Sequence, residues 1–251
     1  MNRSPAGEAR NRTVLITGIT SGIGSAVADR FAREGWDVIG HYFSSGKDAA
    51  DIEASLKKEY GIKASMYKAD LSSKKDLMRF AGEVKGLPVS SLINNAGTYI
   101  SQMHFSELKM DDLERAFTVN VYAPMLLCGA VFAKMKEMEY GRVVNISSIA
   151  AKYGGSAYSM HYGCSKRALE GITKTLAREG AAYNILVNSV RPGVIDTAFH
   201  KKFPKDMTKR IEMIPVKRMG SPGEVAEIVY YLGSDKNGFI TNETVSIAGG
   251  E

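Results

Sequence analysis

The segment Thr13-Val14-Leu15-Ile16-Thr17-Gly18-Ile19-Thr20-Ser21-Gly22-Ile23-Gly24 decides the fold of this chain. Residues 13–17 are apolar and β-branched, which predicts a buried strand. The residues that follow place Ile23, Val27, Ala28 and Phe31 at helical spacing. A strand, a glycine turn and a helix are the context in which a glycine-rich loop binds a dinucleotide, because backbone N–H groups at the helix N-terminus favour a pyrophosphate. Taken alone, the GxxxGxG spacing fits equally a tight turn whose glycines serve only its geometry.

The remaining sequence alternates strand and helix patterns. We expect further strands at 37–43, 62–68, 89–93, within 141–148, at 185–190 and at 243–247. Helices are expected at 47–60, from about 73, at 111–138, from before Tyr162 to about 182, and at 221–233. No linker, composition break or internal repeat divides the chain. The prediction is an α/β fold with a single doubly wound (Rossmann-type), mainly parallel sheet and helices on both faces. It places one domain at 13–251, after a mobile polar tail at 1–12.

Composition and charge are those of an ordinary globular protein of 251 residues, with 44% hydrophobic and 24% charged residues. The formal charge of +6 could attract nucleic acid or an anionic membrane. Most basic residues have acidic neighbours in the sequence, however, so no nucleic-acid partner is expected. The densest basic cluster fits an anionic ligand or a solvated face; it comprises Lys201, Lys202, Lys205, Lys209 and Arg210.

Targeting and redox signals favour a cytoplasmic protein. The sequence has no run of 18 apolar residues, so no membrane span is predicted. Residues 1–12 lack the apolar region of a signal peptide. Two cysteines, Cys128 and Cys164, do not form a disulfide framework and are expected to be reduced thiols. No metal site is expected.

Tyr162 and Lys166 are four residues apart in a predicted helix, so they share one face. An ammonium beside a phenol favours the phenolate, which predicts a Tyr162 pKa below its usual value of about 10. A phenol of that kind can transfer a proton near neutral pH. The pair alone also fits two unrelated surface residues, because this spacing is common by chance.

Several polar or small residues fall at the predicted carboxyl ends of strands. Parallel sheets bind ligands at this edge. Asp70 could accept a hydrogen bond from an adenine amino group, or it could cap the helix near Ser73. Small residues near Asn94 would let a cofactor lie across the strand ends. The residues that share this placement are the Gly18 loop, Asp70, Asn94, Ser148 and Pro192.

Taken in order, these motifs resemble the short-chain dehydrogenase/reductase family over nearly the whole chain, from Thr13 to Gly250. The motifs that carry the resemblance are TGxxxGxG at 17–24, NNAG at 94–97, Asn120, Ser148, YxxxK at Tyr162 and Lys166, and Pro192-Gly193 with Thr197. The resemblance implies hydride transfer between a nicotinamide cofactor and a ketone or secondary alcohol.

The resemblance also implies roles for individual residues. Tyr162 would protonate the developing alkoxide, and Lys166 would lower the Tyr162 pKa and bind the nicotinamide ribose. Ser148 would hydrogen-bond the substrate oxygen, and Asn120 would hold a water that links Lys166 to solvent. The implied cofactor-binding residues are Gly18, Thr20, Ser21, Gly22, Ile23, Gly24, Tyr42, Ser44, Ser45, Asp70, Leu71, Asn95, Ala96, Gly97, Tyr162, Lys166, Pro192, Gly193, Ile195 and Thr197.

The cofactor is expected to be NADP(H), with NAD(H) possible. The acidic residue with which many family members bind the NAD ribose, at the end of the second strand, is absent. Tyr42, Phe43, Ser44 and Ser45 stand there, followed by Lys47. An acid would repel a 2′-phosphate, whereas hydroxyls and a lysine would not. One feature points the other way, because Ser21 replaces the basic residue common in the glycine loop.

The substrate is expected to be a small-molecule or acyl-thioester ketone. The overall sequence is similar to the 3-oxoacyl-carrier-protein reductases, but two positions that such enzymes use to dock the acidic carrier are Glu139 and Tyr183 here. Arg142, Arg167 and the basic cluster could compensate. The alternatives are a sugar, polyol or other small-ketone dehydrogenase, or a catalytically silent regulator that senses a dinucleotide. We expect a pocket lid at 198–217, a mouth lined by 99–105 and 151–160, a structural role for His161, and a homodimer or homotetramer.

Overall fold

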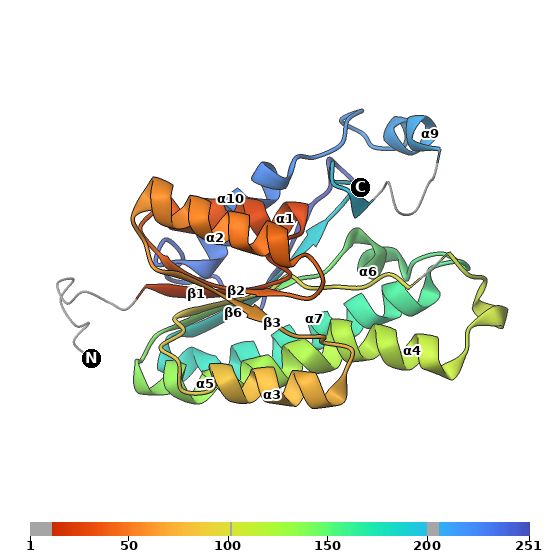
Figure 1. Cartoon of the computed structure of the whole chain (residues 1–251). Helices are drawn as coiled ribbons and strands as arrows, with labels where there is room; N and C mark the ends of the chain where they lie inside the picture. Colours follow the sequence, from red (N-terminus) through yellow and green to blue (C-terminus); the bar gives the residue numbers. More distant parts are fainter. Residues whose placement is uncertain (1–11, 101, 200–205) are drawn as a thin grey trace.

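Seven parallel strands in the order β3-β2-β1-β4-β5-β6-β7 form one sheet (Figure 1). The computed structural model describes residues 12–100, 102–199 and 206–251. The predicted tail up to residue 11 and the basic residues Lys201, Lys202 and Lys205 lie outside the described residues. The strands are β1 Thr13–Thr17, β2 Asp37–Tyr42, β3 Ala64–Lys68, β4 Ser91–Asn94, β5 Gly141–Ile146, β6 Ile185–Pro192 and β7 Thr244–Ile247.

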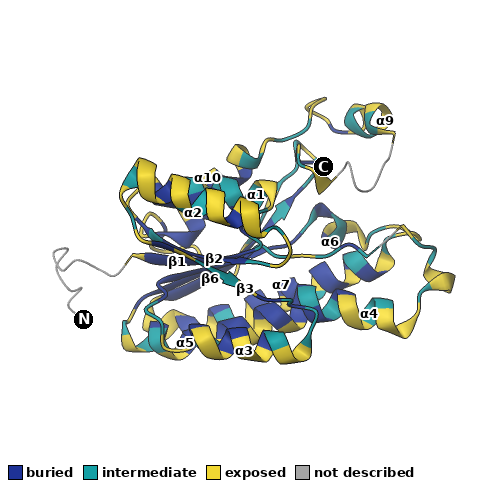
Figure 2. Ribbon diagram, in the orientation of Figure 1, coloured by how far each residue is buried: buried dark blue, intermediate teal, exposed yellow. Residues whose placement is uncertain are grey.

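Helices cover both faces of the sheet, as the α/β prediction required (Figures 1 and 2). One face carries α1 Gly22–Ala32, α2 Gly46–Tyr60 and α10 Pro222–Gly233. The other carries α3 Lys74–Val84, α4 Met110–Phe117, α5 Ala123–Glu137 and α7 Met160–Gly180. Because both faces are covered, β1 and β5 are buried along their whole length.

Each face has its own hydrophobic core. On the α1 side, the Phe31 ring packs edge-on against Trp36 and Tyr230, with centroids 5.2 and 5.1 Å away. On the other side, Phe80, Leu127 and Met135 are fully buried against the sheet. The fold therefore holds the sheet rigidly and leaves its two ends to carry loops.

The structure corrects several predicted boundaries. β3 begins at Ala64, two residues later than expected, and β6 continues to Pro192 because it pairs with β7 from Ser189↔Thr244 to Pro192↔Ile247. The helix expected at 111–138 is interrupted by a π-helical turn at Thr118–Tyr122, which carries Asn120. Such turns occur frequently at functional sites.

One helical stretch, Met110–Glu137, is long and apolar enough to cross a membrane by length and composition alone, because an 18-residue window within it has a mean hydropathy of 1.7. The protein buries 61% of the apolar window, and Leu127 and Val131 pack in the core under the sheet. Its apolar character is that of a core helix. Cys128, in the same stretch, is a buried free thiol, and Cys164 is an exposed one.

Because all seven strands are parallel, their carboxyl ends lie along one edge of the sheet, which we call the carboxyl edge. The chain order reverses between β1 and β4, neighbouring strands near the middle of the sheet, and such sheets bind ligands at this point. Short elements surround this edge: η1 Phe105–Glu107, α6 Ile149–Tyr153 and α9 Met207–Glu212. Part of the expected lid, residues 200–205, lies outside the described residues. Its end, at Val216, is anchored by a hydrogen bond to the carbonyl of Gly249.

Candidate active site

The glycine loop between β1 and α1 is packed too closely for side chains. Gly18 has φ +66°, and a Cβ there would lie 3.0 Å from the Cα of Ala96. A Cβ on Gly24 would lie 2.3 Å from the Gly18 carbonyl oxygen. Ser21 is the N-cap of α1, and its hydroxyl accepts from the Gly24 N–H at 3.0 Å. The loop thus brings the helix N-terminus and its N–H groups to the carboxyl edge.

Asn95 and Thr17 fasten the end of β4 to this loop. The Asn95 amide nitrogen donates to the carbonyls of Thr17 and Gly18 at 2.8 and 3.0 Å, and to the Ser21 hydroxyl at 3.1 Å. The Thr17 hydroxyl accepts from the N–H groups of Asn95 and Ala96 at 3.0 and 2.9 Å. Asn95 and Ala96 therefore lie beside the glycine loop, and their predicted contact with the cofactor stays a prediction.

Asp70 does not cap the next helix. The N-cap of α3 is Ser73, whose side chain accepts from the Asp76 N–H. Asp70 Oδ1 accepts instead from the N–H and hydroxyl of Ser72, at 2.9 and 2.7 Å. Leu71 beside it is buried. The helix-cap interpretation of Asp70 is therefore wrong, and the adenine-binding interpretation stays a prediction.

Helix α7 places Tyr162 and Lys166 against the ends of β4 and β5. Lys166 is buried, and its Nζ donates to the Ile146 carbonyl at 2.7 Å and lies 5.9 Å from the centroid of the Tyr162 ring. Ser148 follows β5, and its hydroxyl accepts from the Ala150 N–H at 3.1 Å as the N-cap of α6. Three of the four predicted catalytic side chains, those of Ser148, Tyr162 and Lys166, thus lie at the carboxyl edge.

The expected direction of the Tyr162 pKa shift is wrong for this structure. Burial raises the pKa of the Tyr162 phenol above its usual value, and a hydrogen bond with Ser148 only partly opposes this. Burial also lowers the pKa of Lys166 to about 8. The cost of burying a charge therefore outweighs the attraction of a nearby ammonium. Tyr162 is a protonated phenol here, and so is ready to donate a proton.

Asn120 and Lys166 flank the small residue Gly97. A Cβ on Gly97 would lie 3.0 Å from Lys166 Nζ and 3.4 Å from Asn120 Oδ1. The Asn120 side chain accepts from the Thr98 N–H and donates to the Thr98 carbonyl and the Ser165 hydroxyl. Its side chain therefore braces the loop after β4. The water relay expected of Asn120 stays a prediction.

The segment after β6 closes onto the glycine loop. Gly193 follows Pro192, and its N–H donates to the Ile247 carbonyl. The Thr197 hydroxyl donates to the Ile195 carbonyl at 3.4 Å. A Cβ on Gly22 would lie 2.9 Å from the Thr197 Cγ2 atom. Two predicted cofactor residues from these segments, Gly22 and Thr197, therefore pack directly against each other.

Aromatic side chains lie beside Tyr162, and Tyr99 and Tyr158 among them belong to the two segments, 99–105 and 151–160, that we expect to line the mouth of the site. The Tyr99 ring packs edge-on against Tyr162, with centroids 5.5 Å apart, and also contacts His161 and Phe199. The Tyr99 hydroxyl donates to the Tyr158 carbonyl at 3.2 Å. These contacts form an apolar wall beside the phenol that would exclude water.

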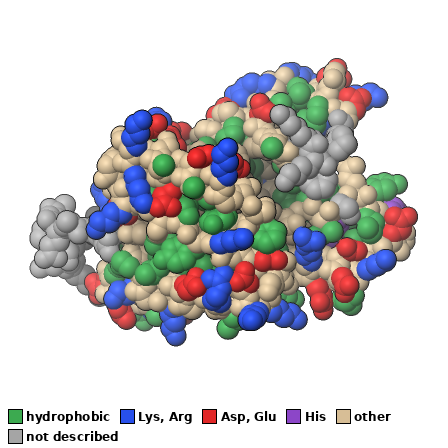
Figure 3. Space-filling model, viewed as in Figure 1, with side chains coloured by type: hydrophobic (Ala, Val, Ile, Leu, Met, Phe, Trp, Pro, Cys, Tyr) green, Lys and Arg blue, Asp and Glu red, His purple; other side chains and the backbone are tan. Residues whose placement is uncertain are grey.

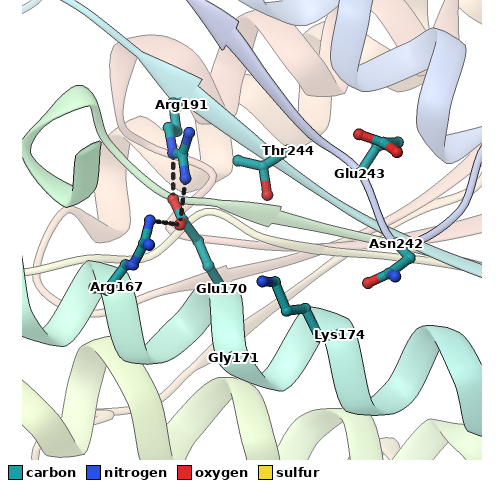
Figure 4. A pocket seen from close by; sticks show the side chains of 8 residues that line it. All are labelled: Arg167, Glu170, Gly171, Lys174, Arg191, Asn242, Glu243 and Thr244. Atoms are coloured by element: carbon teal, nitrogen blue, oxygen red, sulfur yellow. Dashed lines mark hydrogen bonds and ion pairs between the residues drawn. The ribbon is translucent and has the colours of Figure 1, made fainter.

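Glu170 in α7 is a buried carboxylate that was not among the predicted site residues. It binds the side chains of Arg191 and Arg167 (Figure 4). Its Oε1 accepts from the Ser147 hydroxyl at 2.7 Å and from Arg191 Nε at 2.6 Å. Its Oε2 accepts from Arg191 Nη2 at 2.7 Å. Burial raises the pKa of Glu170, but the hydrogen bonds of Arg191 and Ser147 reverse this and bring it below its usual value. Glu170 thus joins α7 to the residues that precede Ser148 and Pro192.

The two arginines proposed to replace carrier-docking residues behave differently. Arg142 is buried, and its guanidinium donates to the carbonyls of Asn184, Ser234 and Asn237. It is not available to a partner. Arg167 is exposed and donates to Glu170 at 3.3 Å (Figure 4).

The site fits a nicotinamide dinucleotide. The glycines of the loop pack directly against the backbone and side chains around them, and the N-terminus of α1, whose N–H groups favour an anion, opens at the carboxyl edge; we call the loop and this helix end together the glycine cradle. At the other end of the site lie a buried ammonium and a phenol. Within the described ranges, with 1–11, 101 and 200–205 left aside, no group of three His, Cys, Asp or Glu side chains could hold a metal ion. This combination defines a Rossmann-fold oxidoreductase.

Comparison with known proteins identifies the family. A profile described as enoyl-(acyl carrier protein) reductase matches residues 18–251. The 3-oxoacyl-[acyl-carrier-protein] reductase of Aquifex aeolicus is 34% identical, over 96% of this chain and 97% of its own. The acetoacetyl-CoA reductase of Shinella zoogloeoides is 35% identical, over 96% and 98%. The chain is an oxidoreductase and belongs to the short-chain dehydrogenase/reductase family.

Solved structures agree with this assignment. A 3-oxoacyl (acyl-carrier-protein) reductase from Agrobacterium tumefaciens with bound NADP has a TM-score of 0.87 at 28% identity, covering 96% of this chain and 95% of its own. A xylitol dehydrogenase with bound NAD+ has a TM-score of 0.85 at 28% identity, covering 97% and 100%. The shared architecture therefore serves both dinucleotides and more than one substrate class.

The lowered pKa of Lys166 predicts a pH dependence. The ammonium is charged below pH of about 8 and is lost as the pH rises through that value. The role predicted for Lys166 is to assist Tyr162 through its positive charge, and with this role we expect kcat/KM for ketone reduction to fall above a pH of about 8. Initial rates over this range would show the fall. The Lys166→Arg variant keeps its positive charge at high pH. Its kcat/KM should therefore fall less above a pH of about 8, even if its maximal rate is lower than that of wild type. A wild-type kcat/KM that stays constant through a pH of about 8 would contradict this role of the Lys166 ammonium.

Proposed function

We propose that this protein is an NADP(H)-dependent reductase of ketones, and that its substrate is a 3-oxoacyl thioester. The observation that supports this most is the joint placement of Ser148, Tyr162 and Lys166 beside the glycine cradle. Bound NADPH supplies a hydride to the carbonyl carbon. The protein supplies the proton and the orientation.

The chain's own residues have distinct roles in this proposal. Ser148 holds the substrate oxygen, and Tyr162, protonated because it is buried, donates its proton to that oxygen. Lys166 binds the ribose and favours the phenolate that remains. Asn120 holds the loop that carries Thr98 in place, and it binds a water molecule that relays protons between Lys166 and solvent. Ile195 and Thr197 orient the carboxamide, and the Tyr99 wall excludes water.

The preference for NADP(H) rests on the carboxyl end of β2. Tyr42 is the last residue of this strand, and no acid follows it before α2. Ser44 is exposed, Ser45 is the N-cap residue of α2, and Lys47 is in its first turn. A helix N-terminus, hydroxyls and a lysine favour a 2′-phosphate. NAD(H) is the second candidate, since the xylitol dehydrogenase of similar structure binds NAD+.

The substrate class rests on the curated relatives, which are named for acyl-thioester ketones. Docking of an acyl-carrier protein is not part of the proposal, since Glu139 and Tyr183 are not basic and Arg142 is buried. A CoA thioester, as named for the Shinella zoogloeoides relative, is therefore the proposed form of the substrate. A sugar or polyol dehydrogenase is the second candidate, favoured by the xylitol dehydrogenase likeness.

A substrate panel tests this function. NADPH is mixed with the protein and acetoacetyl-CoA, small ketones, sugar ketones or an enoyl-CoA, and loss of its absorbance is followed. We expect the highest kcat/KM with acetoacetyl-CoA. Highest activity with a polyol and NAD+ would establish the second candidate, and highest activity with the enoyl thioester would contradict ketone reduction. Tight NADPH binding without any turnover would indicate a regulator instead.

The remaining properties belong to the same proposal. We propose that residues 13–251 act as one cytoplasmic domain and that the protein forms a homodimer or homotetramer. The exposed apolar side chains of Tyr122, Met125 and Leu126 on the α5 side support self-association. Basic and acidic side chains are interspersed on the face in Figure 3. This mixture of charges supports the absence of a nucleic-acid partner.

A further inference from the structure

His41 is a buried histidine at the carboxyl end of β2, close to the glycine loop. Its side chain packs against the Phe80 ring, with centroids 5.0 Å apart. Its Nδ1 lies 3.2 Å from the backbone nitrogen of Gly18, and its Nε2 lies 3.0 Å from the carbonyl oxygen of Ala69. One ring therefore bridges two loops that belong to different strands.

The two contacts define the tautomer of the ring. The Ala69 carbonyl can only accept a hydrogen bond, so Nε2 must carry the hydrogen. Nδ1 then has a lone pair, which accepts from the Gly18 N–H. A protonated imidazole has an N–H at both positions. It would direct one of them at the Gly18 N–H, and that hydrogen bond would be lost.

Both bridged residues border the dinucleotide cradle. Gly18 begins the glycine loop in the left-handed region, and its carbonyl is already held by Asn95. His41 holds the N–H of the same residue, so the loop is fixed on both sides. Ala69 immediately precedes Asp70 and Leu71, the predicted adenine-binding residues. The ring thus links the phosphate end of the cradle to its adenine end.

We propose that neutral His41 is a positioning residue for dinucleotide binding, which holds Gly18 through Nδ1 and Ala69 through Nε2 and so sets the glycine loop in its binding geometry. This rests on the proposed NADP(H) function and deepens it. His41 acts through the loop and does not contact the reacting atoms.

The charged groups around the ring determine how binding depends on pH. Burial lowers the pKa of His41, while the hydrogen bond to Ala69 and the carboxylates of Asp76 and Asp70 raise it in part. Arg79 offsets one of these acids, since its guanidinium is ion-paired with Asp76. The lowered pKa keeps the ring neutral near pH 7. Dinucleotide affinity should therefore be constant there and fall once acidification protonates the ring.

Three substitutions separate the two contacts. In His41→Asn, an amide oxygen can take the place of Nδ1 and accept from Gly18. In His41→Gln, the longer side chain can reach Ala69 but leaves Gly18 without that acceptor. His41→Phe keeps the ring packing and loses both hydrogen bonds. The NADPH dissociation constant of each folded protein is measured by cofactor fluorescence, from neutral pH down to the lower limit at which the fold persists by circular dichroism.

We expect the Asn variant to bind NADPH within about threefold of wild type, and the Gln and Phe variants to bind about tenfold or more weakly, as loss of a buried hydrogen bond implies. On acidification, the wild type should lose more affinity than the Asn variant. The 2′-phosphate of the cofactor also titrates near pH of about 6, but it does so equally in both proteins. If the Phe variant does not fold, the comparison of Asn with Gln decides.

Imidazole nitrogen NMR of the protein without cofactor gives a separate readout, and we expect the tautomer with hydrogen on Nε2. The opposite tautomer, or equal NADPH affinity of the Asn, Gln and Phe variants, would overturn the inference. A merely structural role would lower the thermal stability of the variants without this order of affinities. A wild-type protein that binds neither NADPH nor NADH would overturn the proposed function together with this inference.

Discussion

Tyr162→Phe is expected to lower kcat for ketone reduction by a factor of about 10² to 10⁴, the usual contribution of a positioned general acid. The phenol is protonated because burial raises its pKa, and it hydrogen-bonds Ser148. Phenylalanine keeps the edge-on contact with Tyr99 but has no proton to give. The NADPH dissociation constant should stay within a few-fold of wild type, since Lys166 and the glycine loop are unchanged. Steady-state rates and cofactor fluorescence measure the two effects.

Tyr183→Phe is a matched control, because Tyr183 is an exposed tyrosine in the turn that leads into β6, at the opposite end of α7. It should have wild-type kcat. If Tyr162→Phe retained most of the activity, the phenol would not be the proton donor. If the Tyr162→Phe variant also lost NADPH binding, the Tyr162 hydroxyl would act in cofactor binding and not in proton transfer.

Tyr42→Asp should reverse the cofactor preference. Tyr42 is the last residue of β2, at the carboxyl edge, and a carboxylate there would face the 2′-phosphate of NADPH. Like charges a few ångströms apart near a protein surface cost about 1 to 4 kcal/mol, so NADPH affinity should fall at least about fivefold. NADH affinity should rise, because a carboxylate can accept from the ribose hydroxyls.

Tyr42→Asn is the control for this change, since asparagine has nearly the same shape as aspartate but carries no charge. It should weaken NADPH binding much less than Tyr42→Asp does. Dissociation constants of both dinucleotides for the three proteins give the comparison. Equal losses of NADPH affinity in the Asn and Asp variants would show that the phosphate does not lie near this position, and the NADP(H) preference would need another basis.

The sequence predicted the architecture because its patterns are local. The apolar run at Thr13–Thr17 and the glycines after it determine a strand and a turn within twelve neighbouring residues. The spacing of Tyr162 and Lys166 determines that they share a helix face. Ser148 and Asn95 could be placed with them because parallel strands end at one edge.

What the sequence could not predict depends on contacts between distant residues. The burial that raises the Tyr162 pKa comes from the assembled sheet and from Tyr99, so the local Lys166 spacing pointed in the wrong direction. Arg142 looked like a surface cation, but its partners Ser234 and Asn237 lie more than 90 positions away. The π-helical turn at Asn120 has the same apolar pattern as an ordinary helix.

His41 and Glu170 show the same limit from the opposite side. Both are polar residues in otherwise apolar strand and helix patterns, which would have marked them as buried polar groups that need partners. The pattern could not name those partners. Gly18 and Ala69 for His41, and Ser147 and Arg191 for Glu170, become neighbours only through strand pairing and helix packing.

Transfer of deuterium to acetoacetyl-CoA, from NADPH that carries deuterium at both C4 positions of the nicotinamide, tests the central claim most directly. The wild-type protein should place one deuterium on the carbinol carbon of the 3-hydroxyacyl product in each turnover, and Tyr162→Phe should form almost no labelled product. A wild-type protein that binds NADPH but transfers no label to any ketone, or that places the label on an alkene carbon of an enoyl thioester, would contradict NADPH-dependent ketone reduction at Ser148, Tyr162 and Lys166.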